Sequence, residues 1–316
     1  MKNQTIGMIT SYPNIPNYDW LWHQTPHNFG QWGNIQILAK ASKPDYLLMY
    51  QYDFPKPEKK SWLNKLKNKN HPRENIQNQL REVPKEKIIY LIREPPLNEV
   101  IEIHKYNYKQ AQNYCGYISG PDDLAPTPNY MPAIWYLNNS FRDLNDLGIT
   151  EKTKKCSWIT SGITRSANHR HRLDFLRKLQ ENQIKFDLFG RNLPDWADKK
   201  GEIGTKWHSL APYYYNLAIE NYAENDWYVT EKLWDALLAW CLPIYYGGPA
   251  ADKLLPPGSF LRLPSLDATG IEFIKEVIAT PDRWHSAIPA ITEARQIILH
   301  KLNLLNWLSE YVNIYQ

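Results

Sequence analysis

The sequence predicts an α/β protein of two domains, each built on a parallel β-sheet, that face each other across a cleft. Its length of 316 residues exceeds one average domain, and it suits two domains of about 150 residues. Short apolar runs alternate with helical periodicity, which is typical of parallel sheets. The polar segment 138–155 is the best linker candidate. We therefore expect an N-terminal domain over residues 1–150 and a C-terminal domain over residues 151–316, whose last helix could pack back on the first domain.

In the first half, Ile35, Leu38 and Ala39 have helical spacing and indicate a helix. The run from Lys87 to Ile92 is the clearest buried strand of this half, and a helical pattern over residues 98–112 follows it. The strands expected here are residues 6–10, 46–50, 87–92, 114–119 and 133–137.

In the second half, Thr230 has the chemistry of an N-cap. The apolar stripe after it indicates a helix with a buried inner face and comprises Leu233, Ala236, Leu237, Trp240 and Cys241. Another helix carries Leu173, Leu176 and Leu179. The other elements expected in this half are strands 156–161, 186–191, 213–219 and 242–246 and helices 271–279, 281–299 and 301–312.

The composition narrows the class of function. The chain has 13 Trp and 21 Tyr, and aromatic rings stack on the C–H faces of sugars, although most of these rings will belong to the core. A net charge of +4 would help attract an anionic ligand but falls short of a nucleic-acid signature. We expect no nucleic-acid partner.

Three cysteines, Cys115, Cys156 and Cys241, lie in apolar surroundings without Cys-x-x-Cys spacing. Their odd number favours a reducing compartment. The first residues lack the apolar core of a signal peptide, and no run reaches the ~18 apolar residues of a membrane span. These features predict a cytoplasmic protein.

The segment from Lys56 to Arg73 is strongly basic. Such a segment is usually a solvated loop or helix face. The alternative is contact with an anionic surface, either the inner leaflet of a membrane or an acidic glycolipid acceptor. The second interpretation would make the protein peripheral at the membrane.

The strand at residues 213–219 ends on Glu220 and Asn221 and precedes the helix that begins after Thr230. The start of that helix combines free backbone N–H groups, the positive end of the helix dipole and the ammonium of Lys232, which suits a phosphate oxygen. A carboxylate beside them, Glu231, suits the paired hydroxyls of a ribose. The combination indicates a nucleoside diphosphate. A purely structural strand–helix unit with a capping Thr is the alternative.

A basic cluster, residues 165–172, lies at the start of the helix that carries Leu173, Leu176 and Leu179, and it could clamp a diphosphate. Arg170 and Arg172 compete for that role. His169 and His171 alternate without carboxylate or Cys companions, which is weak support for a metal site.

Glu94 follows the buried strand 87–92 and precedes Pro95 and Pro96. The carboxyl ends of parallel strands form the catalytic edge of a sheet, so Glu94 should point toward the cleft. The alternative is a salt-bridged surface residue, here paired with Arg93. The aromatic residues between Tyr12 and Trp32 could likewise grip an acceptor sugar or pack back on their domain.

The pattern Glu220-Asn221, then Tyr228-Val229-Thr230-Glu231-Lys232, then Pro243-Ile244-Tyr245-Tyr246-Gly247 resembles the donor-binding signature of the α1,3/1,4-fucosyltransferases. This family is inverting and uses GDP-fucose. The resemblance implies the GT-B fold, in which two Rossmann-like domains face each other across a cleft.

The resemblance also implies roles for individual residues. Glu94 matches the family's proposed general base, and Arg172, seven residues before Leu179, matches an arginine of the family. The residues expected to bind GDP-fucose are Arg172, Gly190, Glu220, Asn221, Tyr228, Glu231 and Lys232. No cofactor or active-site metal is expected, because the cationic clamp can replace a cation.

The acceptor is expected to be an N-acetylglucosamine or glucose unit of an oligosaccharide or glycolipid. Two rivals remain. One is an inverting transferase for another nucleotide sugar, since phosphate and ribose contacts do not distinguish the sugar. The other is a catalytically inactive, sugar-binding relative.

Overall fold

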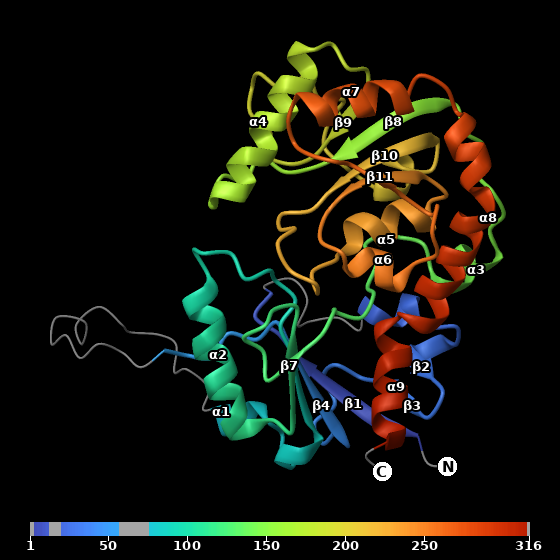
Figure 1. Cartoon of the computed structure of the whole chain (residues 1–316). Coiled ribbons are helices and arrows are strands. Elements are labelled where there is room, and N and C mark those ends of the chain that lie inside the picture. Colours follow the sequence, from blue (N-terminus) through green and yellow to red (C-terminus); the bar gives the residue numbers. More distant parts are fainter. Residues whose placement is uncertain (1–2, 13–19, 57–75, 315–316) are drawn as a thin grey trace, which may run out of the picture.

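The computed structural model describes residues 3–12, 20–56 and 76–314, which form two α/β domains around separate, mostly parallel sheets (Figure 1). The N-terminal sheet has the order β2-β3-β1-β4-β5-β6-β7, and only β2 runs antiparallel to its neighbour. Its strands are β1 (Gln4–Ile9), β2 (Gln31–Trp32), β3 (Ile35–Ile37), β4 (Tyr46–Tyr50), β5 (Ile88–Leu91), β6 (Tyr117–Gly120) and β7 (Thr127–Pro128).

The C-terminal sheet has the order β12-β11-β10-β8-β9 and is parallel throughout. Its strands are β8 (Lys154–Ile159), β9 (Asp187–Phe189), β10 (Tyr213–Ile219), β11 (Leu242–Tyr246) and β12 (Leu261–Arg262). The two parallel sheets confirm the predicted α/β fold class.

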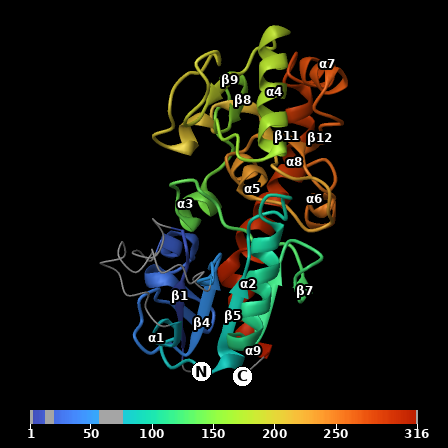
Figure 2. The same ribbon diagram turned by 90° about the vertical axis from the view of Figure 1, so that its left-hand side faces the viewer.

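Helices cover both sheets. Those before β8 are the 3₁₀ turns η1 (Trp20–Gln24), η2 (Asn28–Gly30) and η4 (Lys85–Lys87) and the helices α1 (Ile76–Gln79), α2 (Ile101–Tyr114) and α3 (Phe141–Asp146). Those after it are α4 (Ala167–Glu181), η5 (Lys206–Ser209), α5 (Glu231–Leu238), α6 (Ala250–Leu254), α7 (Ala268–Val277), α8 (Asp282–Gln296), the π-helical η6 (Ile297–Lys301) and α9 (Leu304–Ile314). In Figure 2, α5 and α6 border the N-terminal domain, and α7 lies at the far end.

Both sheets reverse their strand order at one point. In the C-terminal sheet, β9 lies on one side of β8, and β10, β11 and β12 lie on the other. In the N-terminal sheet, β3 and β4 flank β1 in the same way. In open α/β sheets, ligands bind outside the carboxyl ends of the strands where the order reverses. The topology therefore singles out the ends of β8 and β10 and the ends of β1 and β4.

The last helix returns to the N-terminal domain (Figure 1). The backbone of Ala133 accepts from Leu304 N at 3.0 Å and donates to Leu302 O at 2.7 Å. Leu305 and Leu308 of α9 are fully buried in a core that includes Ile6 of β1. α2 packs on the opposite face of that sheet. Both faces are covered because alternate side chains of each strand point to opposite faces.

Two sequence predictions were wrong. Residues 35–39 are not helical: Ile35 and Ile37 alternate inward in β3, and Leu38 N bonds Ile6 O at 2.9 Å. Residues 133–137 are not a strand apart from one bridge at Ala133. The side-chain amide of Gln24 donates to Trp135 O at 2.7 Å. This carbonyl is therefore bonded by a side chain and not by a neighbouring strand.

Two segments differ from their predicted extent. The linker candidate 138–155 contains α3, whose first turn is closed by a capping box of Ser140 and Asp143. α5 ends at Leu238, so Trp240, with φ of 62°, lies beyond the helix that its spacing had suggested. The helices predicted over 271–279, 281–299 and 301–312 correspond to α7, α8 with η6, and α9.

In the described ranges, no helix has the length and apolar character needed to cross a bilayer. Residues 57–73 of the basic segment that begins at Lys56 lie outside the described residues.

Candidate active site

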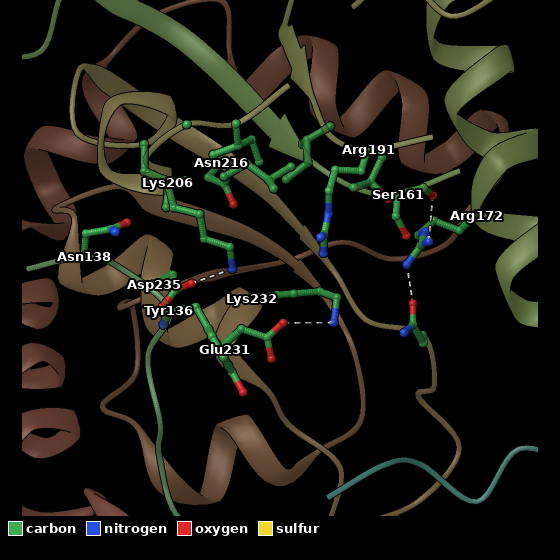
Figure 3. A pocket seen from close by; sticks show the side chains of 17 residues that line it. Tyr136, Asn138, Ser161, Arg172, Arg191, Lys206, Asn216, Glu231, Lys232 and Asp235 are labelled. Carbon is green, nitrogen blue, oxygen red and sulfur yellow. Dashed lines mark hydrogen bonds and ion pairs between the residues drawn. The ribbon is translucent and has the colours of Figure 1, made fainter. Parts of the chain in front are cut away.

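Two adjoining hollows, of about 460 and 490 Å³, lie between the carboxyl ends of the two sheets. Figure 3 shows the first, which opens where β8 and β10 diverge. Thr160 and Ser161 come from the end of β8, and Asn216 from β10. The second contains Glu94 from the N-terminal domain. The hollows share a wall formed by Tyr136, Arg191, Lys206, Asn221, Glu231 and Lys232.

The start of α5 is held by a buried carboxylate. Glu220 accepts hydrogen bonds from Thr230 N and Thr230 Oγ1, both at 2.8 Å, and from Lys232 Nζ at 3.0 Å. Thr230 is also the N-cap, and its hydroxyl accepts from Lys232 N at 3.4 Å. Glu220 lines neither hollow. Glu220 therefore positions Lys232 and the start of α5 without facing either hollow.

Glu231 forms an ion pair with Arg93, which comes from the other domain. Burial alone would raise the pKa of Glu231, but Lys232 and Arg93 lower it overall. The alternative considered for Glu94, a salt bridge with Arg93, is not formed, because Arg93 pairs with Glu231. The Arg93 guanidinium donates to Glu231 and to the Tyr136 hydroxyl, whereas Glu94 accepts from the hydroxyl of Tyr12.

Arg172, rather than Arg170, lies at the first hollow. Its guanidinium donates to the Asn221 side chain and to Ser161 O, the latter at 3.1 Å. Arg172 is 4% exposed, and burial lowers its pKa to about 10, which leaves it charged at neutral pH. Its Nε has no partner among the described residues. Arg170 is exposed and bonds Thr164 O at 2.9 Å.

Glu94 is fixed by the ends of two other strands. The Gln51 side chain, just past β4, accepts from Arg93 N at 2.8 Å and from Glu94 N at 3.1 Å. Gln51 itself has φ of 45°, an uncommon backbone conformation of the kind found at functional sites. Past β1, the hydroxyl of Tyr12 donates to Glu94 Oε1 at 2.5 Å. Burial raises the pKa of Tyr12, so this hydroxyl stays protonated at neutral pH.

The aromatic residues before β3 therefore separate into two groups. Tyr12 lines the second hollow. Trp22 donates to Ile37 O at 2.8 Å, and Trp32 packs edge-on against Phe141 at 5.5 Å. These two rings pack back on the protein. Tyr18 lies outside the described residues.

Sequence reasoning missed the pair of Lys206 and Asp235. Lys206 Nζ lies 2.7 Å from Asp235 Oδ2, and Asp235 Oδ1 accepts from Tyr136 N at 2.9 Å. Burial would lower the pKa of Lys206, but Asp235 and Glu231 outweigh it and raise that pKa. Burial raises the pKa of Asp235 despite Lys206. The available signal was a carboxylate among the apolar residues that follow the first two positions of α5.

Gly190 and Tyr228 have different places. Tyr228 is 3% exposed and lines the second hollow. Gly190 lines neither hollow, but it has φ of 152°, and a Cβ there would lie 1.6 Å from Thr160 O. Glycine is thus required where β9 approaches the end of β8. Its role is to place the adjacent Arg191.

The hollows carry a positive balance. Five cationic side chains face three anionic ones, which leaves two positive charges. The cations are Arg93, Arg172, Arg191, Lys206 and Lys232, and the anions are Glu94, Glu231 and Asp235. Within the described ranges, no three His, Cys, Asp or Glu side chains gather as a metal site. The site can bind an anion of the size of a nucleotide against a nearby carboxylate.

Residues 149–276 match the family described as glycosyltransferase family 10 (fucosyltransferase), C-terminal part. The matched residues lie within the C-terminal domain, and this part of the chain is similar to that fucosyltransferase family. The stretch includes Arg172, Gly190, Glu220, Asn221, Tyr228, Glu231 and Lys232 and excludes Glu94.

Curated relatives agree with this assignment. The 4-galactosyl-N-acetylglucosaminide 3-alpha-L-fucosyltransferase of Gorilla gorilla gorilla is 32% identical over 120 residues, which cover 37% of this chain and 31% of that protein. The 3-galactosyl-N-acetylglucosaminide 4-alpha-L-fucosyltransferase of Homo sapiens is also 32% identical over 120 residues, 37% of this chain and 30% of that protein. The match thus spans about a third of each relative.

Among solved structures, an alpha-glucosyltransferase in complex with UDP and a 13-mer DNA superimposes with a TM-score of 0.57 and 10% identity. The superposition covers 99% of this chain and 100% of that one. At this identity the likeness concerns the fold alone. The fold is GT-B, as the sequence predicted.

Proposed function

We propose that this fucosyltransferase-family protein transfers L-fucose from GDP-fucose to a hydroxyl of a glycan acceptor, with inversion. The observation that carries the proposal is the shared wall of the two hollows. This wall joins the first hollow, which is cationic and lies in the C-terminal domain, to the second hollow, where Glu94 can act as a base. A nucleotide sugar spanning the wall would place its anomeric carbon near an acceptor hydroxyl that this carboxylate can deprotonate.

The reaction is a single displacement. The acceptor oxygen bonds to the anomeric carbon of fucose from the face opposite GDP, while the bond from that carbon to the β-phosphate oxygen breaks. Glu94 takes the proton of the acceptor hydroxyl. The departing GDP gains negative charge, which Arg172, Lys232 and the N-terminus of α5 stabilise.

Glu231 is proposed to hold the ribose hydroxyls. Its ion pair with Arg93 uses Oε2, and Oε1 lies 3.9 Å from Lys232 Nζ. An ionised carboxylate can accept about four hydrogen bonds, so it can bind a hydroxyl without releasing Arg93. Asn221 holds Arg172, and Tyr228 lines the second hollow, where the sugar is proposed to lie. Gly190 and Glu220 position their neighbours.

We further propose that no cofactor or divalent metal is required, because the cationic side chains can neutralise the diphosphate. The names of the curated relatives support a galactosyl-N-acetylglucosaminide acceptor. An N-acetylglucosamine or glucose unit of an oligosaccharide or glycolipid is therefore proposed here. Nucleic acid is not a proposed partner, given the modest net charge of +4.

A reducing, cytoplasmic location is proposed because Cys115, Cys156 and Cys241 are all buried and unpaired. Peripheral contact with a membrane through residues 56–73 stays a proposal.

A donor panel tests the function. Purified protein is incubated with N-acetyllactosamine or lactose and with GDP-fucose, GDP-mannose, UDP-galactose or UDP-N-acetylglucosamine. We expect transfer from GDP-fucose only. Transfer from another donor would favour an enzyme for a different nucleotide sugar. Binding of GDP without transfer to any glycan acceptor would favour an inactive sugar-binding relative.

A further inference from the structure

Arg191 lies on the wall shared by the two hollows and was not among the residues expected at the site. It follows β9 and Gly190 directly. Figure 3 shows its side chain entering the pocket between Lys206 and Arg172, with the guanidinium directed toward Lys232. The remaining cations come from other elements, since Arg93 follows β5 and the other three belong to α4, η5 and α5.

The backbone at Arg191 is fixed. Its carbonyl accepts from Gly162 N at 3.0 Å, and one residue pair earlier Thr160 N donates to Phe189 O at 3.0 Å. A Cβ on Gly162 would lie 1.6 Å from Asn192 O, so the two chain segments are in direct contact. Because Arg172 bonds Ser161 O beside them, the two arginines are held in one frame.

The other four cations of the hollows have acceptors within the protein. Arg93 pairs with Glu231, Lys206 with Asp235, Lys232 with Glu220, and Arg172 with Asn221. In the part of the chain that the structure describes, the guanidinium of Arg191 has no hydrogen bond, ion pair or ring contact. An exposed arginine is usually just solvated. This one points into a cavity that already carries excess positive charge, which favours a ligand as its partner.

We propose that Arg191 binds the diphosphate of the nucleotide sugar, as a further donor-binding residue beside Arg172 and Lys232. The inference rests on the proposed function and assigns this residue a place in it. The nucleoside fits the first hollow, and the transferred sugar fits the second, next to Glu94. The diphosphate links the two, so it lies at the shared wall. A planar guanidinium can donate two parallel hydrogen bonds to phosphate oxygens.

The test is calorimetric binding of guanosine, GMP and GDP to the full chain and to Arg191→Ala. Loss of a hydrogen bond to a charged group should weaken GDP binding about 10- to 100-fold. The loss should be smaller for GMP and absent for guanosine. Arg191→Lys keeps the positive charge but loses the planar guanidinium that donates two parallel hydrogen bonds. It should therefore bind GDP more tightly than Arg191→Ala but less tightly than the unaltered chain. Arg283→Ala removes one positive charge from α8, outside the hollows, and should change nothing.

The outcomes separate the two claims. If the unaltered chain binds GDP and Arg191→Ala binds it equally well, the inference is overturned and the proposed function stands. Equal losses for guanosine and GDP would also overturn it, because they would indicate a nucleoside contact or a disturbed fold. The melting temperature of ligand-free Arg191→Ala is measured as well. If it equals that of the unaltered chain, a disturbed fold is excluded. If the unaltered chain does not bind GDP, both claims fall.

Discussion

Arg93 and Glu231 form an ion pair across the cleft, although 138 residues separate them in the chain. Each belongs to a different domain, and each side chain is less than a fifth exposed. The same carboxylate is proposed to hold the ribose. The ion pair therefore connects a contact between the domains with the proposed ribose site.

Glu231→Gln should lower the free energy of unfolding by about 1–3 kcal/mol at neutral pH, because it leaves Arg93 without its charged partner. The folded-state pKa of Glu231 lies below its unfolded value. Its ionisation therefore stabilises the protein above the ordinary glutamate pKa of about 4.3, and that contribution is lost as pH falls further. Urea unfolding of both proteins between pH 7 and pH 3.5 measures this. A difference that stays constant down to pH 3.5 would contradict the assigned pKa direction.

GDP should raise the melting temperature in the presence of EDTA. Ligand at about 100 times its Kd adds about 2.7 kcal/mol to the stability of a protein that binds it only when folded. UDP at the same concentration should have much less effect. Thermal scans with EDTA, with Mg²⁺ and with Mn²⁺ test both points. An equal shift with UDP, or a shift only with metal, would argue against the GDP clamp as described.

Arg172→Ala and Lys232→Ala should each slow fucose transfer by about 10²-fold or more, because each removes a charge that stabilises the leaving group. Both should also weaken GDP binding. Arg170→Ala is the matched control, since Arg170 is exposed, belongs to the same helix and lines neither hollow. Initial rates and calorimetry compare the three. A crippled Arg170→Ala beside an active Arg172→Ala would reverse the assignment.

Gly190→Ala should destabilise the protein by more than about 3 kcal/mol, since the new Cβ would meet Thr160 O and the backbone angle is unfavourable. Gly201 provides a control that separates these causes. It also has a positive φ, of 140°, but a Cβ added there would have no atom within 4 Å among the described residues. Gly201→Ala should therefore cost only the backbone strain, about 1–3 kcal/mol. Equal losses in denaturant unfolding would mean that the close approach to β8 is unimportant.

The sequence allowed the local parts of this site to be predicted. A strand end at Glu220, a cap at Thr230 and a buried strand before Glu94 are all visible in short patterns. The helix predicted at residues 35–39 was wrong, because the spacing of only three apolar residues does not distinguish a helix from a strand. The β3 strand is defined by its pairing with β1, which lies far from it in the sequence.

The contacts between distant segments could not be predicted. Lys206 reaches Asp235 from a 3₁₀ turn 29 residues away, and no periodic pattern marks that turn as part of the site. Gln51 fixes Glu94 only because β4 and β5 are neighbours and its own backbone is left-handed. Such partners follow from the packing of strand ends and of the two domains.

The central claim is that Glu94 acts as the base, in the domain opposite the nucleotide site. Glu94→Gln keeps the shape of the side chain and its acceptor for Tyr12 but removes its basicity. Glu102→Gln on the surface of α2 is the control. The decisive measurement compares calorimetric GDP affinity with the rate of fucose transfer in these variants. We expect Glu94→Gln to bind GDP as the unaltered chain does while transfer falls by about 10²–10⁴-fold. Near-normal transfer would remove Glu94 from the mechanism, and loss of GDP binding would assign it to the donor site or the fold.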